Sequence, residues 1–457
     1  MTALSFSGLP LRARVEQLAE RLRVADAADL ETRRSLAGEL RALRTLYRSN
    51  SSEFSADLLD MLKNVSAALS RAPERPVLER VLKDTFGYDA FRTGQLPIIE
   101  AVLNGNDCVG VMPTGAGKSL TYQLPARVLG RLTLVISPLI ALMKDQVDAL
   151  NQLGFSATFL NSSLELDERR ERIQKLRRGE YEIVYAAPEG LEASVGRVIA
   201  ELDIGLVAVD EAHCISQWGH DFRPAYRNLR ALKTRLGRAP ILALTATATP
   251  EVTLDIVDQL GMRTPSIFRG TFFRKNLRIS AIPKSDVPVS TKVAIREFVA
   301  SRRGQAGIVY CLSRRSTEAM SEELLSHGLS AAHYHAGLEP QERARVQDAF
   351  RAGSVDVVVA TIAFGMGIDK PDVRFVVHHD LPRSTEGYYQ EIGRAGRDGL
   401  PSDCVLFYSW SDVMAYERMT SQGDDAELIA RQSAQTREVF RLAEAEGCRH
   451  QNLVGYF

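Results

Sequence analysis

Short runs of β-branched and apolar residues alternate with longer helical stretches from about residue 77, and this alternation constrains the fold more than any other feature of the sequence. The first set of expected strands comprises residues 107–112, 132–138, 156–161, 182–188, 204–210 and 241–247. Stretches of helical character, such as 139–154 and 166–179, separate most of them. Strands that alternate with helices in this way predict a parallel sheet covered by helices on both faces.

The alternation begins again after about residue 275. The second set of expected strands comprises residues 306–312, 330–336, 355–361 and 373–379, and the helices between them comprise 314–328 and 339–353. We therefore expect an α/β protein with two tandem parallel-sheet domains. The expected units are a helical N-terminal extension at 1–75, a first domain at 76–275, a second domain at 276–410 and a helical tail at 411–457. The domain boundary is least sharp between Arg274 and Ser290, where part of the sequence is loop-like.

The N-terminal extension carries leucines at three- and four-residue steps. These are Leu18, Leu22, Leu36, Leu40 and Leu43, which lie among arginine and glutamate residues. Such spacing places an apolar stripe along each helix. We expect a small helical cap that buries its own stripes. The alternative is a docking surface for a protein partner or for a second copy of the chain.

Composition narrows the classes to which the chain can belong. The 57 Lys and Arg residues balance the 57 Asp and Glu residues, so any binding of nucleic acid must come from local, salt-sensitive patches. The five cysteines are placed singly, without a CxxC pair, which is typical of a reducing compartment. No apolar run approaches the ~20 residues that span a bilayer, and no signal-like segment opens the chain. We expect a cytoplasmic protein that binds no membrane.

The segment MPTGAGKS, residues 112–119, follows an expected strand and opens an expected helix, as a phosphate-binding loop does. Its candidate nucleotide-binding residues are Thr114, Gly115, Gly117, Lys118 and Ser119. The glycines let backbone N–H groups approach phosphate oxygens, the lysine supplies a cation, and the serine hydroxyl can ligate Mg²⁺. A methionine replaces the first glycine of the usual GxxxxGK[ST] pattern, and the shorter TGxGKS form is common in nucleic-acid motors.

A second polar segment, VDEAHCISQWGHDFRPAY at residues 209–226, joins two kinds of chemistry. Asp210 would hold Mg²⁺, and Glu211 would orient or deprotonate the attacking water of a phosphoryl transfer. The segment then provides side chains that stack on bases and contact phosphates, namely Trp218, His220, Phe222 and Arg223. His213 has two interpretations: it relays the nucleotide state toward Thr245–Thr247, or it is a satisfied polar residue beneath the site.

A third segment, YYQEIGRAGRDG, offers Gln390, Arg394 and Arg397 at helical spacing in the second domain. We expect the two arginines to share one helix face and to point into a cleft. An arginine finger contributes roughly 10³ to 10⁵ in rate, so hydrolysis would depend on closure of the two domains. Gly393 and Gly396 weaken a helix, which favours a close approach at this point over a solvated basic face.

Eight segments between residues 77 and 411 occur together in a set order. They are FGYDAFRTGQ, MPTGAGKS, SPLIALMKDQ, DEAHCISQWGHDFRP, LTATAT, YHAGL, ATIAFGMGIDKP and QEIGRAGRDG. This series resembles the motifs of superfamily 2 helicases, and the aromatic loop directly after DEAH resembles the RecQ family of DNA helicases in particular. The resemblance implies two RecA-like domains with ATP in the cleft between them. It implies that Tyr88 stacks on adenine, that Arg92 supports this contact and that Gln95 binds the edge of the adenine. It also places Asp369 near the nucleotide sugar or the interdomain contact.

The resemblance also implies a DNA track. It leads us to expect translocation on single-stranded DNA in the 3′ to 5′ direction and unwinding of tailed duplexes in repair or recombination. Within the aromatic loop, Trp218, Phe222 and Arg223 would couple DNA to hydrolysis. Asn161 with Ser162, and Thr361, would lie along the DNA. The alternatives are a DNA-stimulated ATPase or translocase with little unwinding, and a nucleic-acid-binding adaptor that ATP switches.

The segment GCRHQNLVGYF resembles the start of the RecQ zinc region, and Cys448 matches its first cysteine. The resemblance places three further zinc cysteines and a winged-helix region beyond Phe457. A structural zinc site needs about four ligands. We therefore expect no structural zinc in this chain, and we expect the aromatic loop to carry more of the coupling to DNA.

Overall fold

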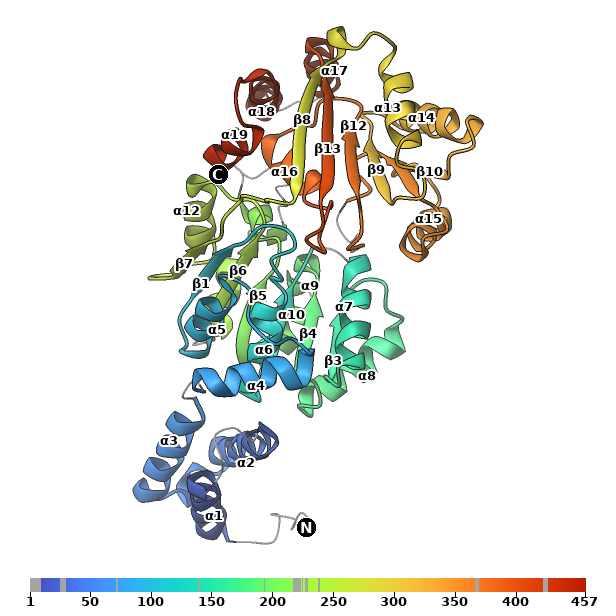
Figure 1. Cartoon of the computed structure of the whole chain (residues 1–457). Coiled ribbons are helices and arrows are strands. Elements are labelled where there is room, and N and C mark those ends of the chain that lie inside the picture. The colour runs from blue at the N-terminus through green and yellow to red at the C-terminus, as the bar shows by residue number, and fades with distance from the viewer. Residues whose placement is uncertain are drawn as a thin grey trace.

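The computed structural model describes residues 10–24, 30–70, 73–138, 140–192, 194–216, 223, 225–226, 229–236, 239–365, 370–421 and 426–457. Figure 1 shows a helical module at one end, a first sheet domain in the middle, and a second sheet domain with the C-terminal helices at the other end. Within the described ranges, no helix combines the length and the apolar character needed to cross a membrane.

The N-terminal module consists of three helices with a core of their own. They are α1 (Leu11–Val24), α2 (Leu30–Ser49) and α3 (Ala56–Ser70), with a short 3₁₀ turn at Ser51–Glu53. The buried residues of the core are Val15, Leu18, Leu36, Leu40, Leu43, Phe54, Leu58, Leu62 and Val65. Four of the five leucines picked out by their spacing are therefore buried, and Leu22 is partly buried against them. The module touches the first domain through α2 and α6.

The first domain is built on a seven-stranded sheet in the order β3-β4-β2-β5-β6-β1-β7, and every pairing in it is parallel. The strands are β1 (Cys108–Val111), β2 (Leu132–Ile136), β3 (Ala157–Leu160), β4 (Ile183–Ala186), β5 (Ile204–Val209), β6 (Ile241–Thr245) and β7 (Ser266–Arg269). The helices are α4 (Arg75–Phe86), α5 (Gln95–Leu103), α6 (Leu120–Leu129), α7 (Ile140–Gln152), α8 (Leu166–Arg177), α9 (Pro188–Glu192), α10 (Ser194–Ala200), α11 (Leu229–Leu236) and α12 (Pro250–Gln259).

Apolar side chains cover both faces of this sheet. Successive residues of β5 alternate between two buried clusters, with Val207 in one and Ala208 in the other. Side chains alternate across a strand, so two clusters mean that helices cover both faces. A 3₁₀ turn at Ala212–Ile215 follows β5 directly.

The second domain repeats this design with a six-stranded parallel sheet in the order β10-β11-β9-β12-β13-β8. Its strands are β8 (Leu277–Pro283), β9 (Gly307–Tyr310), β10 (Ala331–Tyr334), β11 (Val357–Ala360), β12 (Phe375–His378) and β13 (Ser402–Tyr408). Its helices are α13 (Thr291–Ala300), α14 (Arg314–Ser326), α15 (Pro340–Ala352) and α16 (Thr385–Ile392), with a 3₁₀ turn at Lys284–Asp286. The predicted α/β fold with two parallel-sheet domains is confirmed.

Three strands were not predicted, and all three lie near the junction of the domains. β7 is an edge strand with alternating exposure, and β8 is an edge strand whose residues are mostly half-buried. β13 pairs with β8 over seven positions, from Ser402 opposite Leu277 to Tyr408 opposite Pro283. The edge strands β7 and β8 lack the continuous apolar run that marks a central strand of a parallel sheet, so the sequence pattern is weak there. This reason does not apply to β13, which is an inner strand with an apolar run at residues 404–408.

The C-terminal segment is helical, with α17 (Trp410–Thr420), α18 (Ala426–Glu444) and α19 (Arg449–Tyr456). Val439, Ala443 and Leu453 belong to a core cluster of the second domain, so these helices pack onto that domain. Beyond α19, the ring of Phe457 stacks on Phe272 with 4.4 Å between the ring centroids. The segment therefore also touches the junction of the two domains, next to α12 in Figure 1.

Candidate active site

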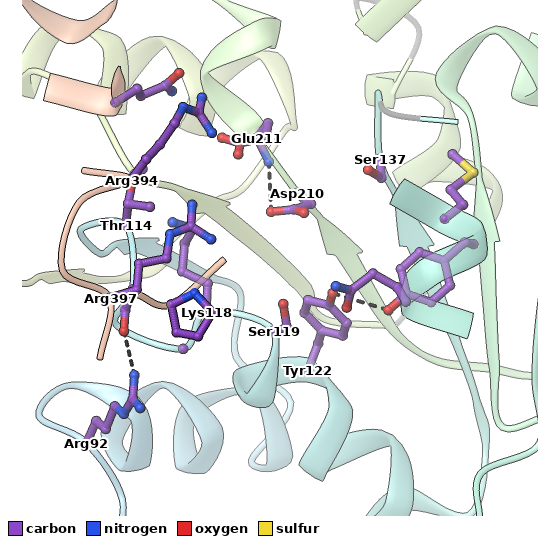
Figure 2. A pocket seen from close by; sticks show the side chains of 18 of the residues that line it. Arg92, Thr114, Lys118, Ser119, Tyr122, Ser137, Asp210, Glu211, Arg394 and Arg397 are labelled. Atoms are coloured by element: carbon purple, nitrogen blue, oxygen red, sulfur yellow. Dashed lines mark hydrogen bonds between the residues drawn. The ribbon is translucent and has the colours of Figure 1, made fainter. Parts of the chain in front are cut away.

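A cavity of about 480 Å³ lies where the two domains meet. The first domain contributes Thr114, Gly115, Gly117, Lys118, Ser119, Asp210 and Glu211 to its lining. The second domain contributes Gln390, Arg394 and Arg397. Figure 2 shows Arg394 and Arg397 close to Lys118, with Asp210 and Ser119 farther across the same space. The structure thus brings together three segments that are far apart in the sequence.

The phosphate loop runs between the end of β1 and the start of α6. Gly115 and Gly117 have φ values of 83° and 75°, a left-handed conformation that favours glycine. A Cβ atom on Gly117 would lie 2.6 Å from Nε2 of Gln95, so the loop also needs glycine for packing. Lys118 donates to the carbonyl of Met112 at 3.3 Å. Burial lowers the pKa of Lys118, and the nearby carboxylates of Glu211 and Asp210 act in the opposite direction.

Asp210 follows β5 and is a half-buried carboxylate that lines the cavity. Partial burial and the neighbouring Glu211 together raise the pKa of Asp210 to about 7, and Lys118 opposes this shift. The Asp210 carboxylate accepts a hydrogen bond of 3.0 Å from the backbone N–H of Glu211. The Tyr226 hydroxyl donates to the Asp210 carbonyl at 3.3 Å, which fixes the backbone beneath the carboxylate.

Glu211 is held in an unusual conformation. Its φ of 47° makes it the one non-glycine residue with positive φ among the described residues. Its Oε2 atom is buried and has no hydrogen-bond partner among those residues, although Nδ1 of His213 lies 3.4 Å away. Strained backbone and unsatisfied buried acceptors cluster at functional sites. Glu211 is therefore placed to accept a hydrogen bond from a molecule in the cavity, such as a water.

A chain of hydrogen bonds leads from these carboxylates to the second domain. His213 is buried, and its Nδ1 atom lies 3.0 Å from Oγ1 of Thr245. Thr245 accepts from the backbone N–H of Thr247 at 3.2 Å, and Nε2 of Gln390 donates to Oγ1 of Thr247 at 3.3 Å. Because Thr245 Oγ1 donates to the Thr247 carbonyl, His213 Nδ1 is the donor in its bond to Thr245. The contacts thus extend from His213 across the interdomain boundary.

The arginines of the second domain do not share a helix face, and that expectation was wrong. α16 ends at Ile392, and Arg394 and Arg397 lie in the turns that follow. Gly396 has a φ of 57°, and a Cβ atom on Gly393 would lie 3.1 Å from Cβ of Thr114. The glycines stop the helix and let the chain approach the phosphate loop. We call residues 394–397 the finger turn. Arg394 is buried and donates to the carbonyl of Gly365.

The three residues expected near adenine lie beside the phosphate loop. Tyr88 is 54% exposed and lines the cavity. Arg92 lines it as well and donates to the Gly115 carbonyl at 2.5 Å. Gln95 is buried, accepts from the N–H of Arg92 at 2.8 Å, and donates to the carbonyls of Ala116 at 3.1 Å and Gly117 at 3.0 Å. In this arrangement the Gln95 amide supports the loop backbone.

The residues expected to contact DNA are described only in part. Trp218, His220 and Phe222 lie outside the described residues. Asp369, which was expected near the nucleotide sugar or the interdomain contact, lies outside them as well. Arg223 donates to the carbonyl of Pro138 at 3.2 Å. Asn161 is buried at the end of β3, where its Oδ1 accepts from Ser163, and Thr361 follows β11. Ser162 is exposed beside Asn161.

Sequence reasoning missed one residue that touches both sides of the cavity. Arg274 lies in the connector between β7 and β8, and its guanidinium donates to the carbonyls of Thr114, Ala395 and Gly396. No motif or periodicity marks it, because its partners are backbone atoms that only the folded chain brings together.

Comparison with known proteins defines the class first. Residues 92–256 match the DEAD/DEAH box helicase family, and residues 290–399 match the helicase conserved C-terminal domain. The fold is similar to that of the Mycobacterium smegmatis helicase Lhr, solved bound to ssDNA and AMP-PNP. That similarity has a TM-score of 0.58 and 21% identity, and it covers 80% of this chain and 57% of the other. The fold and cavity are thus those of a two-domain helicase of the DEAD/DEAH box class.

Curated relatives then define the family. The chain is 46% identical over 393 residues to the ATP-dependent DNA helicase RecQ of Haemophilus influenzae, covering 86% of this chain and 63% of that protein. It is 42% identical over 382 residues to the same-named protein of Bacillus subtilis, covering 83% of this chain and 64% of that protein. The chain belongs to the RecQ family of superfamily 2 helicases. It spans a little under two thirds of the length of these relatives.

Proposed function

We propose that this chain is an ATP- and Mg²⁺-dependent DNA helicase of RecQ type. It hydrolyses ATP between its two domains and uses the energy to translocate 3′ to 5′ on single-stranded DNA and to unwind tailed duplexes in repair or recombination. One observation carries the proposal: Lys118, Asp210 and Glu211 of the first domain line the same cavity as Arg394 and Arg397 of the second. Because hydrolysis needs both sets of groups, a movement of one domain relative to the other would change its rate.

The donor set at the phosphate loop fits a nucleotide with Mg²⁺. Ser119 and Asp210 offer the hard oxygen ligands that Mg²⁺ prefers, and both line the cavity beside Lys118. Partial burial raises the pKa of Asp210, and a bound divalent cation would favour the charged form of this carboxylate. When bound, Mg²⁺ neutralises charge on the phosphates during transfer.

The side chains around the cavity have separate roles in the proposed hydrolysis. Oε2 of Glu211 has no hydrogen-bond partner among the described residues, so it can accept a hydrogen bond from a water and orient or deprotonate it. Lys118 stabilises phosphate charge from the first domain, and Arg397 and Arg394 stabilise it from the second. Because phosphoryl transfer depends mainly on positioning and charge, these groups account for hydrolysis without a covalent intermediate.

Coupling to DNA is assigned to the segment that follows the catalytic carboxylates. Trp218, His220, Phe222 and Arg223 have the stacking and cationic side chains that single-stranded nucleic acid requires. Arg223 donates to the carbonyl of Pro138, which lies in the segment that follows β2. The names of the curated relatives, ATP-dependent DNA helicase RecQ, support DNA as the polymer. Trp218→Ala should therefore keep basal hydrolysis and lose stimulation by DNA; equal loss of both would make the loop structural.

Three further assignments are part of the proposal. The cysteines of the described residues are free thiols, and four of the five are buried, which accords with a reducing cytoplasm. Cys448 is exposed and alone matches the zinc region, so we propose that the chain binds no structural zinc. An equimolar zinc content in purified protein would contradict this. The N-terminal module is a candidate docking surface for a protein partner.

ATPase titration with single-stranded DNA, duplex DNA and RNA in parallel tests the motor and its polymer. We expect strong stimulation by single-stranded DNA and no hydrolysis without Mg²⁺. Strand displacement on a 3′-tailed duplex, with a 5′-tailed duplex as the control, tests unwinding and polarity. Stimulated hydrolysis without displacement would favour a translocase, and ATP binding without hydrolysis would favour an adaptor.

A further inference from the structure

The connector between the two sheets passes along the edge of the active site. It comprises residues 270–276, between the last strand of the first sheet and the edge strand of the second. Gly270 donates to the Val111 carbonyl at 2.8 Å, and Phe272 is buried, with its carbonyl accepting from the Tyr389 hydroxyl at 2.9 Å. The connector is therefore packed against both domains and is not a loose tether.

Arg274 is the connector residue whose side chain reaches both sides of the cavity. Its Nη1 donates to the Thr114 carbonyl of the phosphate loop at 3.2 Å. Its Nη2 donates to the carbonyls of Ala395 at 2.9 Å and Gly396 at 3.0 Å, which lie between the two arginines of the finger turn. A single planar guanidinium thus sets the distance between the phosphate loop and the finger turn.

The partners of Arg274 are unusual for a half-buried cation. Among the described residues they are carbonyl and amide oxygens, including Oδ1 of Asn276 at 3.4 Å, and burial lowers the pKa of Arg274. Partial withdrawal of a cation from water without a carboxylate partner costs free energy. A neutral side chain would avoid this cost, so the position of the guanidinium calls for a functional reason.

Each side of the contact is also fixed by other bonds. The phosphate loop is held from below by Arg92 and Gln95, which donate to its carbonyls. The finger turn is held by Asn276, whose Nδ2 donates to Gly396 at 2.9 Å and to Leu400 at 3.0 Å. Removing the Arg274 side chain would therefore leave both segments folded but remove the hydrogen-bonded bridge between them.

We propose that Arg274 is a positioning residue that aligns the finger turn with the phosphate loop, so that Arg394 and Arg397 reach the transferred phosphoryl group in the closed cleft. The proposal rests on the proposed ATP hydrolysis and adds a residue to it. Arg274 acts through the finger turn and is not assigned a contact with substrate. Misplacement of a catalytic group by about 1 Å can cost about 10²-fold in rate. Nucleotide affinity depends on the loop itself and should change little.

Steady-state hydrolysis with saturating single-stranded DNA tests this role. We expect Arg274→Ala to lower kcat by about 10- to 100-fold while KM for ATP and the Kd for ADP stay near the wild-type values. Arg274→Lys keeps the charge and the aliphatic stem, but its one nitrogen cannot bridge both sides, so its kcat should remain low. Lys275→Ala, at the exposed neighbouring position, is the matched control and should behave as wild type.

A double variant distinguishes a positioning role of Arg274 from a role in which it only stabilises the fold. If Arg274 acts through the finger turn, Arg274→Ala should lower kcat much less in an Arg397→Ala background than alone. Multiplicative effects, wild-type kcat in Arg274→Lys, or a parallel loss of ADP affinity would each overturn the proposal. If Arg274→Ala folds poorly, the same measurements are made with Arg274→Lys. A wild-type protein without hydrolysis would contradict the proposed function, whereas an active wild type and an equally active Arg274→Ala would contradict only the positioning role.

Discussion

The two sides of the cavity differ in how their functional groups are held. On the first domain, Lys118 follows β1, and Asp210 and Glu211 follow β5, a central strand of the sheet. On the second domain, Arg394 and Arg397 lie in turns beyond the end of α16, and bonds to Gly365, Arg274 and Asn276 hold this segment.

This difference separates binding from catalysis. The first side is built on strands and lies within one domain, so under the proposed function it would bind nucleotide by itself. The arginines of the second side belong to the other domain, so their position in the cavity depends on how the two domains are placed against each other. Groups that act only when the cleft is closed stabilise the transition state more than the ground state, and this raises kcat. We therefore assign the affinity for nucleotide to the first domain and the rate of hydrolysis to the second.

Removal of a finger arginine should have the largest effect. We expect Arg397→Ala to lower DNA-stimulated kcat by about 10³- to 10⁵-fold, because its charge acts on the developing phosphate charge. Steady-state ATP hydrolysis measures the change. Arg345→Ala, on the exposed face of α15 and paired with Glu342, is the control and should retain the wild-type rate. A loss of less than tenfold in Arg397→Ala would remove this residue from the mechanism.

Glu211→Gln should have the next largest effect. The amide keeps the shape of the side chain but cannot accept a proton, so kcat should fall by about 10²- to 10⁴-fold. ATP affinity should be retained, because Lys118 and the loop glycines are unchanged. Equilibrium binding of a fluorescent ATP analogue, measured beside the hydrolysis rate, checks both parts. If affinity fell with kcat, the carboxylate would be part of the binding site.

The hydrogen bond between Gln390 and Thr247 crosses the boundary and should have a smaller effect. Thr247→Ala removes the hydroxyl that accepts from Gln390, and a bond of this kind contributes about 0.5–1.5 kcal/mol. We expect kcat to fall by up to about tenfold, and Thr247→Ser should recover most of it. Failure of the serine variant to recover activity would show that the methyl group, and not the bond, matters.

The N-terminal module should have the smallest effect on hydrolysis. Leu36 is buried in the core of this module, away from the cavity. Leu36→Ala should destabilise the module by about 2–5 kcal/mol without changing kcat. Hydrogen exchange of α1 to α3 would measure the first effect and ATP hydrolysis the second. A lowered kcat would show that the module communicates with the active site.

The sequence predicted the central strands of both sheets and the groups of the first side, because buried strands are continuous apolar runs and the loop residues follow them directly. It failed at the junction. The edge strands β7 and β8 are partly exposed, and the helical spacing of Arg394 and Arg397 concealed a turn that Gly393 and Gly396 permit. Arg274 could not be found, since its role depends on carbonyl groups from distant segments.

The affinities of wild type and Arg397→Ala for ADP and for ADP with aluminium fluoride, a mimic of the transferred phosphoryl group, test the central claim most directly. We predict equal affinity for ADP in the two proteins and, in the variant, a loss of at least about 10²-fold in affinity for the mimic in the presence of single-stranded DNA. An equal loss of affinity for both ligands would contradict the division between a side that binds and a side that catalyses.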